Sequence, residues 1–140
     1  MTTPLSIRFA PEVLDRLRQR AASVPGATPS GLVQRLVDEG LRMADHPGVT
    51  FRDGPGGRRA ALVVGPDVWE LVVFLREIDE RGEAALAAAA EVFAVPDTAV
   101  RMGLRYYAAF TAEIDAWIAT ALEQSERAEQ EWERQQALLL

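Results

Sequence analysis

The sequence predicts a mainly α-helical protein with short β-strands: a strand and two helices, then a hairpin followed by further helices, and a long helix at the C-terminus. In "LSIRF", Leu5 to Phe9, apolar and polar residues alternate with the period of two that is typical of a half-buried strand. Most of the remaining apolar residues recur at helical spacings of three and four. Glycine and proline clusters such as "SVPG", "ADHPG", "RDGPGG" and "AVPD" interrupt these helical stretches and mark the connections.

Composition excludes several classes of protein. The chain has 140 residues, of which 49% are hydrophobic, so it can bury the core of one domain or of two small ones. It has no cysteine, which excludes a disulfide framework and a thiolate metal site. The first residues lack the basic-then-apolar pattern of a leader, and no run approaches the roughly 18 apolar residues that span a bilayer. We expect a cytoplasmic protein with no membrane partner and no cofactor.

Charge is unevenly distributed along the chain. The net charge is −6, yet residues 1–61 carry nine Arg against six acidic residues, whereas residues 62–140 carry six Arg against fifteen acidic residues. All 15 cationic side chains are Arg, which suits bidentate contacts with bases and phosphates. Genomic base composition explains uniform Arg usage equally well. Nucleic-acid binding is therefore open for the N-terminal part and disfavoured for the rest.

Two helices are predicted after the strand. The first runs from Pro11 to Ala22, because proline suits a first helical turn and apolar residues follow on one face. The second begins at Pro29, with Thr28 as its N-cap, and ends near Pro47. The apolar positions are Val13, Leu14, Leu17 and Ala21 in the first helix and Leu32, Val33, Leu36, Val37 and Leu41 in the second.

A hairpin and four helices are predicted for the rest of the chain. Strands at Val49–Arg52 and Arg58–Val64 are joined by a turn rich in glycine and proline. The expected helices are residues 66–80, closed by Gly82 as a C′ residue, residues 83–93, a helix capped by Asp97 through Ala109, and a long helix capped by Thr111. The pair at 83–93 and 97–109 has a helix-turn-helix pattern, with the hairpin as a wing.

Residues 4–44 resemble the ribbon-helix-helix repressors of the MetJ/Arc/CopG class. The matching stretches are "LSIRFAPEVLDRL" and "GATPSGLVQRLVDEGL". In that family two chains each supply one strand to an antiparallel ribbon, which enters the major groove of operator DNA. The resemblance implies a homodimer in which Ser6 and Arg8 face the bases. The implied dimer core is Leu5, Ile7, Phe9, Leu14, Leu17, Leu32 and Leu36.

Strand geometry supports the same assignment of Ser6 and Arg8. Ser6 and Arg8 are successive outward positions, and an Arg that contacts guanine contributes about 1–3 kcal/mol of discrimination. The first turn of the second helix, with Thr28, Ser30 and Gly31, offers amides and hydroxyls to a phosphate. Pro29 stands where the family often has a basic residue. The alternative is that residues 5–9 form a third strand of the hairpin in a monomer, which leaves Arg8 as a surface charge.

Residues 46–122 resemble a winged-helix domain of unknown function found in VapB/MazE-type antitoxins, which pair with PIN-type ribonuclease toxins. The matching pieces are "HPGV", "GPDVWE" and "RYYAAFTAEIDA". The resemblance implies three parts: residues 1–45 as the ribbon-helix-helix domain, 46–110 as the winged helix-turn-helix domain, and 111–140 as a C-terminal segment. Arg101 and Arg105 lie four residues apart and are candidates for a second DNA contact. The acidic excess equally favours a solvated face or pairing with nearby glutamates.

The C-terminal segment carries a weak apolar stripe. Its positions follow spacings of four and three residues: Ile114, Ile118, Ala121, Ser125, Ala128, Trp132, Gln135 and Leu139. Because the middle of the stripe is small or polar, it suits a segment that orders on a partner better than a self-sufficient coiled coil. The antitoxin resemblance implies a toxin-binding set of Arg127, Trp132, Arg134, Leu138 and Leu139. The alternative is a frayed, solvated helix whose apolar end packs on its own dimer.

Catalytic chemistry has no support in the sequence. His46 is the single histidine, so no Cys or His cluster can hold zinc. "RDGPGGRR" lacks the Lys-Ser/Thr ending of a P-loop and is expected to be a turn. Glu77, Asp79 and Glu80 are expected on a solvated face. The expectation is a non-enzymatic DNA-binding antitoxin that represses its own operon and neutralises a PIN-type toxin. The alternatives are a stand-alone transcription regulator and an interaction or scaffold protein that binds no DNA.

Overall fold

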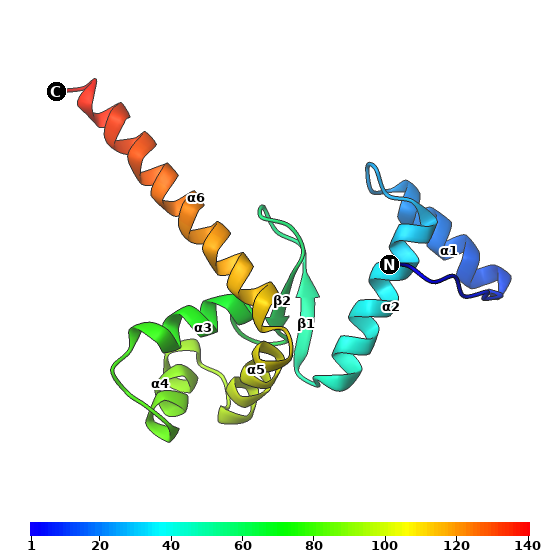
Figure 1. Ribbon diagram of the computed structural model, residues 1–140, viewed down its shortest axis with the longest axis horizontal. Helices are drawn as coiled ribbons and strands as arrows, with labels where there is room; N and C mark the ends of the chain where they lie inside the picture. Colours follow the sequence, from blue (N-terminus) through cyan, green and yellow to red (C-terminus); the bar gives the residue numbers. More distant parts are fainter. The chain divides into compact units, whose positions relative to one another are not determined.

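The computed structural model describes residues 1–140, which form six helices and one two-stranded antiparallel hairpin (Figure 1). This confirms the mainly helical prediction with one hairpin and a long C-terminal helix. The chain divides into two compact units, residues 1–44 and residues 45–140. None of the helices combines the length and the hydropathy needed to cross a bilayer. The elements are α1 (Pro11–Ala22), α2 (Pro29–Asp45), β1 (Val49–Arg52), β2 (Arg59–Leu62), α3 (Val68–Glu77), α4 (Glu83–Phe93), α5 (Asp97–Ala109) and α6 (Thr111–Ala137).

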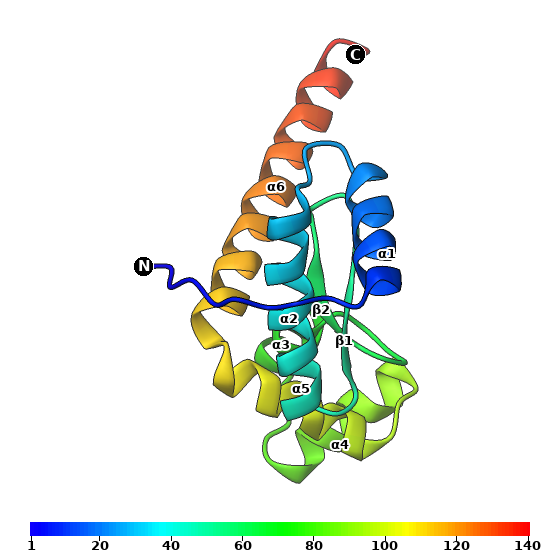
Figure 2. The ribbon, with the colours of Figure 1, turned by 90° about the vertical axis from the view of Figure 1, so that its right-hand side faces the viewer.

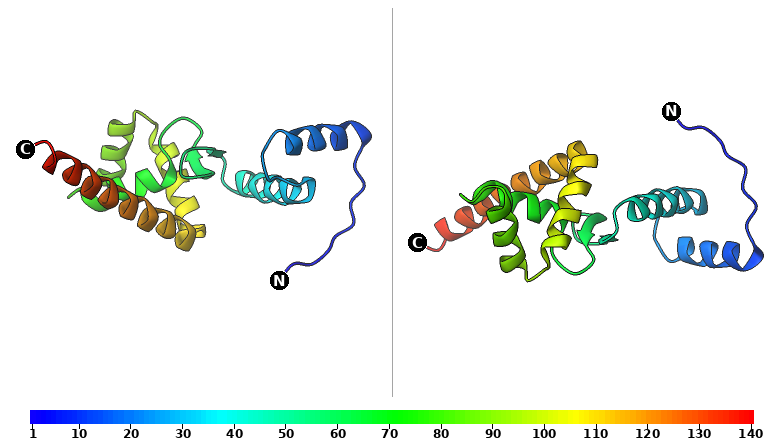
Figure 3. Two further views of the ribbon diagram at one scale, coloured as in Figure 1. Left: turned by 90° about the horizontal axis from the view of Figure 1, so that it is seen from above. Right: turned by 90° about the horizontal axis from the view of Figure 1, so that it is seen from below.

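The N-terminal unit is a pair of helices that lie side by side (Figure 3). Leu17 and Ala21 of α1 are buried against Leu32 of α2, and Leu14 and Val33 pack around them. Both helices begin where the sequence predicts, with proline at the first helical position. The core of this unit is small because each helix contributes only a short length of one face.

Residues 1–10 have no regular secondary structure in the single chain. The predicted strand at residues 5–9 is therefore not formed, and its apolar positions Leu5, Ile7 and Phe9 are 82%, 54% and 37% exposed. A strand needs a neighbour for its backbone hydrogen bonds, and this segment has none. The sheet contains β1 and β2 only, so the alternative of a third strand on the hairpin is wrong. Pairing with a second chain stays a prediction.

The hairpin opens the C-terminal unit and has a regular register. Val49 pairs with Leu62, and Arg52 pairs with Arg59. The turn closes through two hydrogen bonds between Gly54 and Gly57, with N···O distances of 3.1 and 2.9 Å. At the other end, the Arg52 guanidinium donates to the carbonyls of Leu62 and Val63 at 2.7 and 2.8 Å. The turn predicted for "RDGPGGRR" is confirmed, and Arg52 fixes the chain as it leaves β2.

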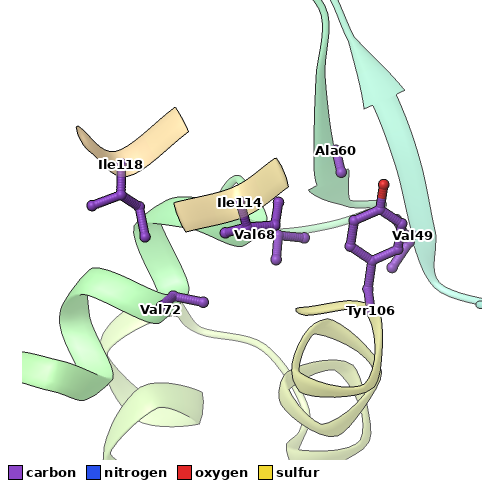
Figure 4. Close-up of a cluster of buried hydrophobic side chains, with 7 residues drawn as sticks. All are labelled: Val49, Ala60, Val68, Val72, Tyr106, Ile114 and Ile118. Carbon is purple, nitrogen blue, oxygen red and sulfur yellow. The ribbon is translucent and has the colours of Figure 1, made fainter. Parts of the chain in front are cut away.

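Tyr106 of α5 lies at the centre of the C-terminal unit and is fully buried (Figure 4). The same cluster takes Val49 and Ala60 from the strands, Val68 and Val72 from α3, and Ile114 and Ile118 from α6. A second cluster joins α3, α4 and α5 through Leu71, Leu86, Ala89, Val95 and Val100. Helix α5 contacts both strands and α3, α4 and α6, so it organises the whole unit.

Three helix-end predictions are wrong. Gly82, with φ +62°, is the N-cap of α4 and does not close α3, which ends at Glu77. Asp97 is the first residue of α5, and the preceding Pro96 is its N-cap. Thr111 is the first residue of α6, and its hydroxyl donates to the carbonyl of Tyr107 at 2.7 Å, so it satisfies the end of α5 instead of capping α6.

Helix α6 has two contrasting halves. Its first turns bury Ile114 and Ile118 in the core, whereas every residue from Leu122 onward is exposed. In Figure 2 the C-terminal turns extend beyond the other elements of the same unit. The acidic tail is thus a continuous helix that its own unit does not cover.

Gly103 lies where α5 comes close to side chains of α3 and β2. A Cβ at this position would lie 2.7 Å from Leu71 Cδ2 and 3.2 Å from Leu62 Cδ2. We expect Gly103→Ala to lower the free energy of unfolding by about 1–2 kcal/mol, because overpacking outweighs the gain in helix propensity. Denaturant unfolding followed by circular dichroism measures this. The control is Gly40→Ala in α2, where a Cβ meets nothing within 4 Å, so stability should rise; equal effects at both sites would contradict the packing account.

Candidate binding surfaces

The candidate base-reading residues lie before α1. Ser6 and Arg8 are exposed, in the segment that has no regular secondary structure. Their backbone remains available for pairing, and Leu5, Ile7 and Phe9 remain uncovered beside them. The structure therefore leaves the predicted reading surface unassembled in one chain.

The candidate phosphate anchor at the start of α2 is partly used within the chain. Thr28 Oγ1 accepts the amide of Gly31 at 3.1 Å, which confirms Thr28 as a capping residue. Pro29 has no amide hydrogen, so the Ser30 amide, its hydroxyl and the Thr28 hydroxyl proton are the donors left for an anion. The candidate phosphate anchor has fewer free donors than the sequence suggested, because the Gly31 amide already donates to Thr28.

An apolar face of the N-terminal unit is uncovered. Leu36, Val37 and Leu41 of α2 are 47%, 51% and 62% exposed, although their spacing is that of a buried stripe. Of the predicted dimer core, Leu17 and Leu32 are buried and Leu14 packs against them within the chain. Units of roughly 40 residues generally need oligomerisation or another constraint to be stable. This face is where a further chain would contribute most.

The two candidate cations on α5 differ in their surroundings. Arg101 Nη2 lies 2.6 Å from Glu83 Oε2 of α4, and this hydrogen bond raises the pKa of Arg101. Arg105 is exposed one turn further along. The opposite face of α5 carries Val100, Gly103 and Tyr106 into the core. The charge of Arg101 is thus matched by a carboxylate, as expected for a surface ion pair.

The candidate toxin-binding residues all lie on the exposed part of α6 and its end. Arg127, Trp132 and Arg134 are exposed on the helix, and Leu138 and Leu139 follow its last turn. None of them packs on the core of the C-terminal unit. Arg127 and Arg134 are seven residues apart and therefore share one face.

A groove on the C-terminal unit was not anticipated from the sequence. It has a volume of about 640 Å³ and lies between the hairpin turn, the start of α3 and one face of α6. Trp69 and Trp117 both line it, and Trp117 packs on the turn, where a Cβ at Gly56 would lie 3.3 Å from its ring. The signal available in the sequence was one tryptophan near the start of each of these two helices.

His46 is a packing residue. Its ring is 8% exposed and meets Tyr106 and Phe110 edge-on, with centroid distances of 5.3 and 5.8 Å. Its aromatic neighbours favour the structural role expected for it. No group of three or more histidine or carboxylate side chains is placed to hold a metal ion.

A polar cluster ties α6 to α3 and α5. Arg76 Nη2 donates to Asp115 Oδ1 at 2.7 Å and to the Tyr107 hydroxyl at 2.8 Å, and that hydroxyl donates to Asp115 at 2.8 Å. The hydrogen bonds from Arg76 and then from Tyr107 lower the pKa of Asp115. The pKa of Tyr107 is raised, chiefly because its hydroxyl donates to the Asp115 carboxylate. The cluster holds the base of the exposed helix in a fixed place.

No family model, curated protein or solved structure matches the chain.

The Asp115 cluster predicts a pH-dependent stability. Because the folded pKa of Asp115 lies below its unfolded value, the carboxylate stabilises the fold above about pH 4, and the contribution is lost as the pH falls through the folded pKa. We expect Asp115→Asn to lower the free energy of unfolding at pH 7 and to approach wild type under acid conditions. Denaturant unfolding from pH 7 to pH 2.5 measures the difference. Exposed Asp79→Asn is the control, and a deficit in Asp115→Asn that does not change with pH would contradict the cluster's role.

Proposed function

We propose that this protein is a homodimeric DNA-binding antitoxin that represses its own operon and captures a PIN-type ribonuclease toxin through its C-terminal helix. The observation that carries the proposal is the uncovered N-terminal unit. An extended segment with alternating apolar residues precedes two helices, and both the segment and the helices leave apolar side chains exposed. A second copy with the same surfaces would cover both at once.

The strand pairing supplies the proposed reading surface. In a two-fold ribbon, Leu5, Ile7 and Phe9 point to the shared core, and Ser6 and Arg8 of each chain point outward together. The ribbon is the part of the molecule that would enter the major groove. The Ser30 amide and the Thr28 and Ser30 hydroxyls would then hold a backbone phosphate and fix the position of the ribbon without reading sequence.

The C-terminal unit is proposed to support the dimer as a winged helix-turn-helix-like domain. Helices α4 and α5 form the helix pair, and the hairpin that α5 packs against is the wing. Pairing of Arg101 with Glu83 favours a supporting role over a second DNA contact, because a charge matched within the chain gains less from a phosphate. The exposed half of α6 is the proposed toxin-binding arm, with Arg127, Trp132 and Arg134 along it.

Arg8→Ala tests the reading surface. We expect binding to the DNA upstream of the protein's own gene to weaken at least tenfold at fixed salt, because each chain of the dimer loses a base contact of about 1–3 kcal/mol. Fluorescence anisotropy with labelled duplex measures the affinity. Arg18→Ala removes the same charge from the exposed side of α1 and should bind nearly as wild type.

Light scattering on the same samples checks the dimer. Wild type and Arg8→Ala should both have twice the chain mass of 15.4 kDa. A monomer at micromolar concentration would contradict the proposed two-chain ribbon. Unchanged DNA affinity in Arg8→Ala would contradict the proposed contact between the strand and the bases. Equal losses in both Arg variants would show a non-specific charge effect.

Truncation tests the arm. A chain ending at Glu123 keeps the buried Ile114 and Ile118 but loses the exposed turns that follow. We expect it to remain folded and dimeric and to lose capture of the protein encoded by the neighbouring reading frame, because Trp132 and the leucine end are gone. Copurification of the two tagged proteins measures this. Undiminished capture by the shortened chain would refute the arm as the toxin-binding segment.

A further inference from the structure

The groove on the C-terminal unit contains none of the candidate DNA-reading residues, and Gln124 is its one lining residue from the exposed arm that starts at Leu122. Its volume of about 640 Å³ is within the range of ligand-binding clefts, which are typically about 300–1,000 Å³. Its walls come from one unit of the protein, so it does not depend on dimerisation. Two half-buried indoles, those of Trp69 and Trp117, provide most of its aromatic surface.

The groove is held in shape by a network around Asp67. The Asp67 carboxylate forms an ion pair with Arg59 of β2, and its Oδ2 accepts the indole N–H of Trp69 at 3.2 Å. The backbone N–H of Asp67 donates to Glu70 Oε1 at 3.3 Å within the capping box of α3. Trp69 is thus fixed from one side by a buried carboxylate. Such preorganisation lowers the entropic cost of binding.

The charge of the groove favours a cation. Arg59 and Asp67 neutralise each other, whereas Glu70 adds a further exposed carboxylate to the lining. Glu70 accepts one hydrogen bond, from the backbone N–H of Asp67, and a carboxylate can accept about four, so it retains capacity for a ligand. Indole is the best side chain for cation–π contact. The Glu70 carboxylate beside two indoles is complementary to a guanidinium or ammonium group.

We propose that this groove docks a basic peptide segment of a partner protein, with an Arg or Lys side chain lying against the indoles beside Glu70. The apolar lining from Pro55, Ala116 and Ala121 suits an aliphatic neighbour of that cation. Its residues differ from those of the proposed DNA contact and from the proposed toxin-binding set.

Nuclear magnetic resonance of the full chain tests the site, because the protein has three tryptophans and hence three indole N–H signals. The probe is the peptide acetyl-Leu-Arg-Leu-Arg-amide, with acetyl-Leu-Glu-Leu-Glu-amide as its charge-reversed counterpart. We expect the basic peptide to shift the Trp69 and Trp117 signals in a saturable way and to leave the Trp132 signal in place. The acidic peptide should shift none of them.

A matched pair of variants separates the groove from general charge. Glu70→Gln removes a groove charge and keeps a residue that completes a capping box. We expect this substitution to weaken binding of the basic peptide about fivefold, because one partly exposed charge contact is lost. Glu126→Gln removes the same charge from the face of α6 opposite Trp117 and should bind as wild type.

Three outcomes would overturn the proposal. Shifts confined to Trp132 would place the peptide on the arm, and equal losses in both Gln variants would show non-specific attraction. A mass above the dimer that Glu70→Gln abolishes would show that a second copy of this chain fills the groove. Failure of DNA or toxin binding in the earlier experiments would leave this result unaffected, so the two proposals can fail separately.

Discussion

The small size of the N-terminal unit is the constraint on which the rest of the molecule depends. Two helices can bury one side chain cluster between them, and here that cluster contains Leu17, Ala21 and Leu32. The hydrophobic gain from so few residues does not offset the conformational entropy of ordering some 40 residues. Every apolar residue that this unit leaves exposed is therefore a reason to associate. The extended segment before α1 also has unpaired backbone groups, which favour association for the same reason.

The C-terminal unit has a larger hydrophobic core of its own. Tyr106 supplies a large ring in the middle of the unit, and elements from both ends of the sequence segment close around it. Its hydroxyl donates a long hydrogen bond, of 3.5 Å, to Glu113 Oε2, so the buried phenol has a polar partner on α6. Because this unit is complete by itself, the surfaces it leaves exposed, the groove and the helical arm, are available for other molecules.

Periodicity and turn chemistry predicted most of the secondary structure. Helix α1, the start of α2 and the hairpin lie where Pro11, Thr28 and the glycine-rich turn indicated. The errors came at helix ends, where a local rule competes with tertiary contacts. Gly82 is a good C′ residue in isolation, but α3 ends earlier and the positive φ of Gly82 serves the start of α4 instead. Thr111 resembles an N-cap. The turn at Phe110 is so short, however, that the Thr111 hydroxyl donates to a carbonyl of α5.

The exposed candidate residues could be predicted from the sequence, but the groove could not. Arg8 and the arm are read directly from local pattern, since nothing else in the chain needs to approach them. The groove requires Arg59, Asp67 and Trp117 to converge from β2, the start of α3 and α6, and no spacing rule encodes such a convergence. Only the fold around Tyr106 brings them together.

The continuity of α6 has a consequence for the energetics of its exposed turns. A solitary helix must first form a turn by fixing several dihedral angles for a single hydrogen bond, and this nucleation is strongly unfavourable. Here the turns that bury Ile114 and Ile118 are already helical, and the Arg76–Asp115 contact fixes them. The exposed residues need only propagate an existing helix, one hydrogen bond at a time. The core of the C-terminal unit thereby acts as a template that supplies the nucleus for a helix it does not cover.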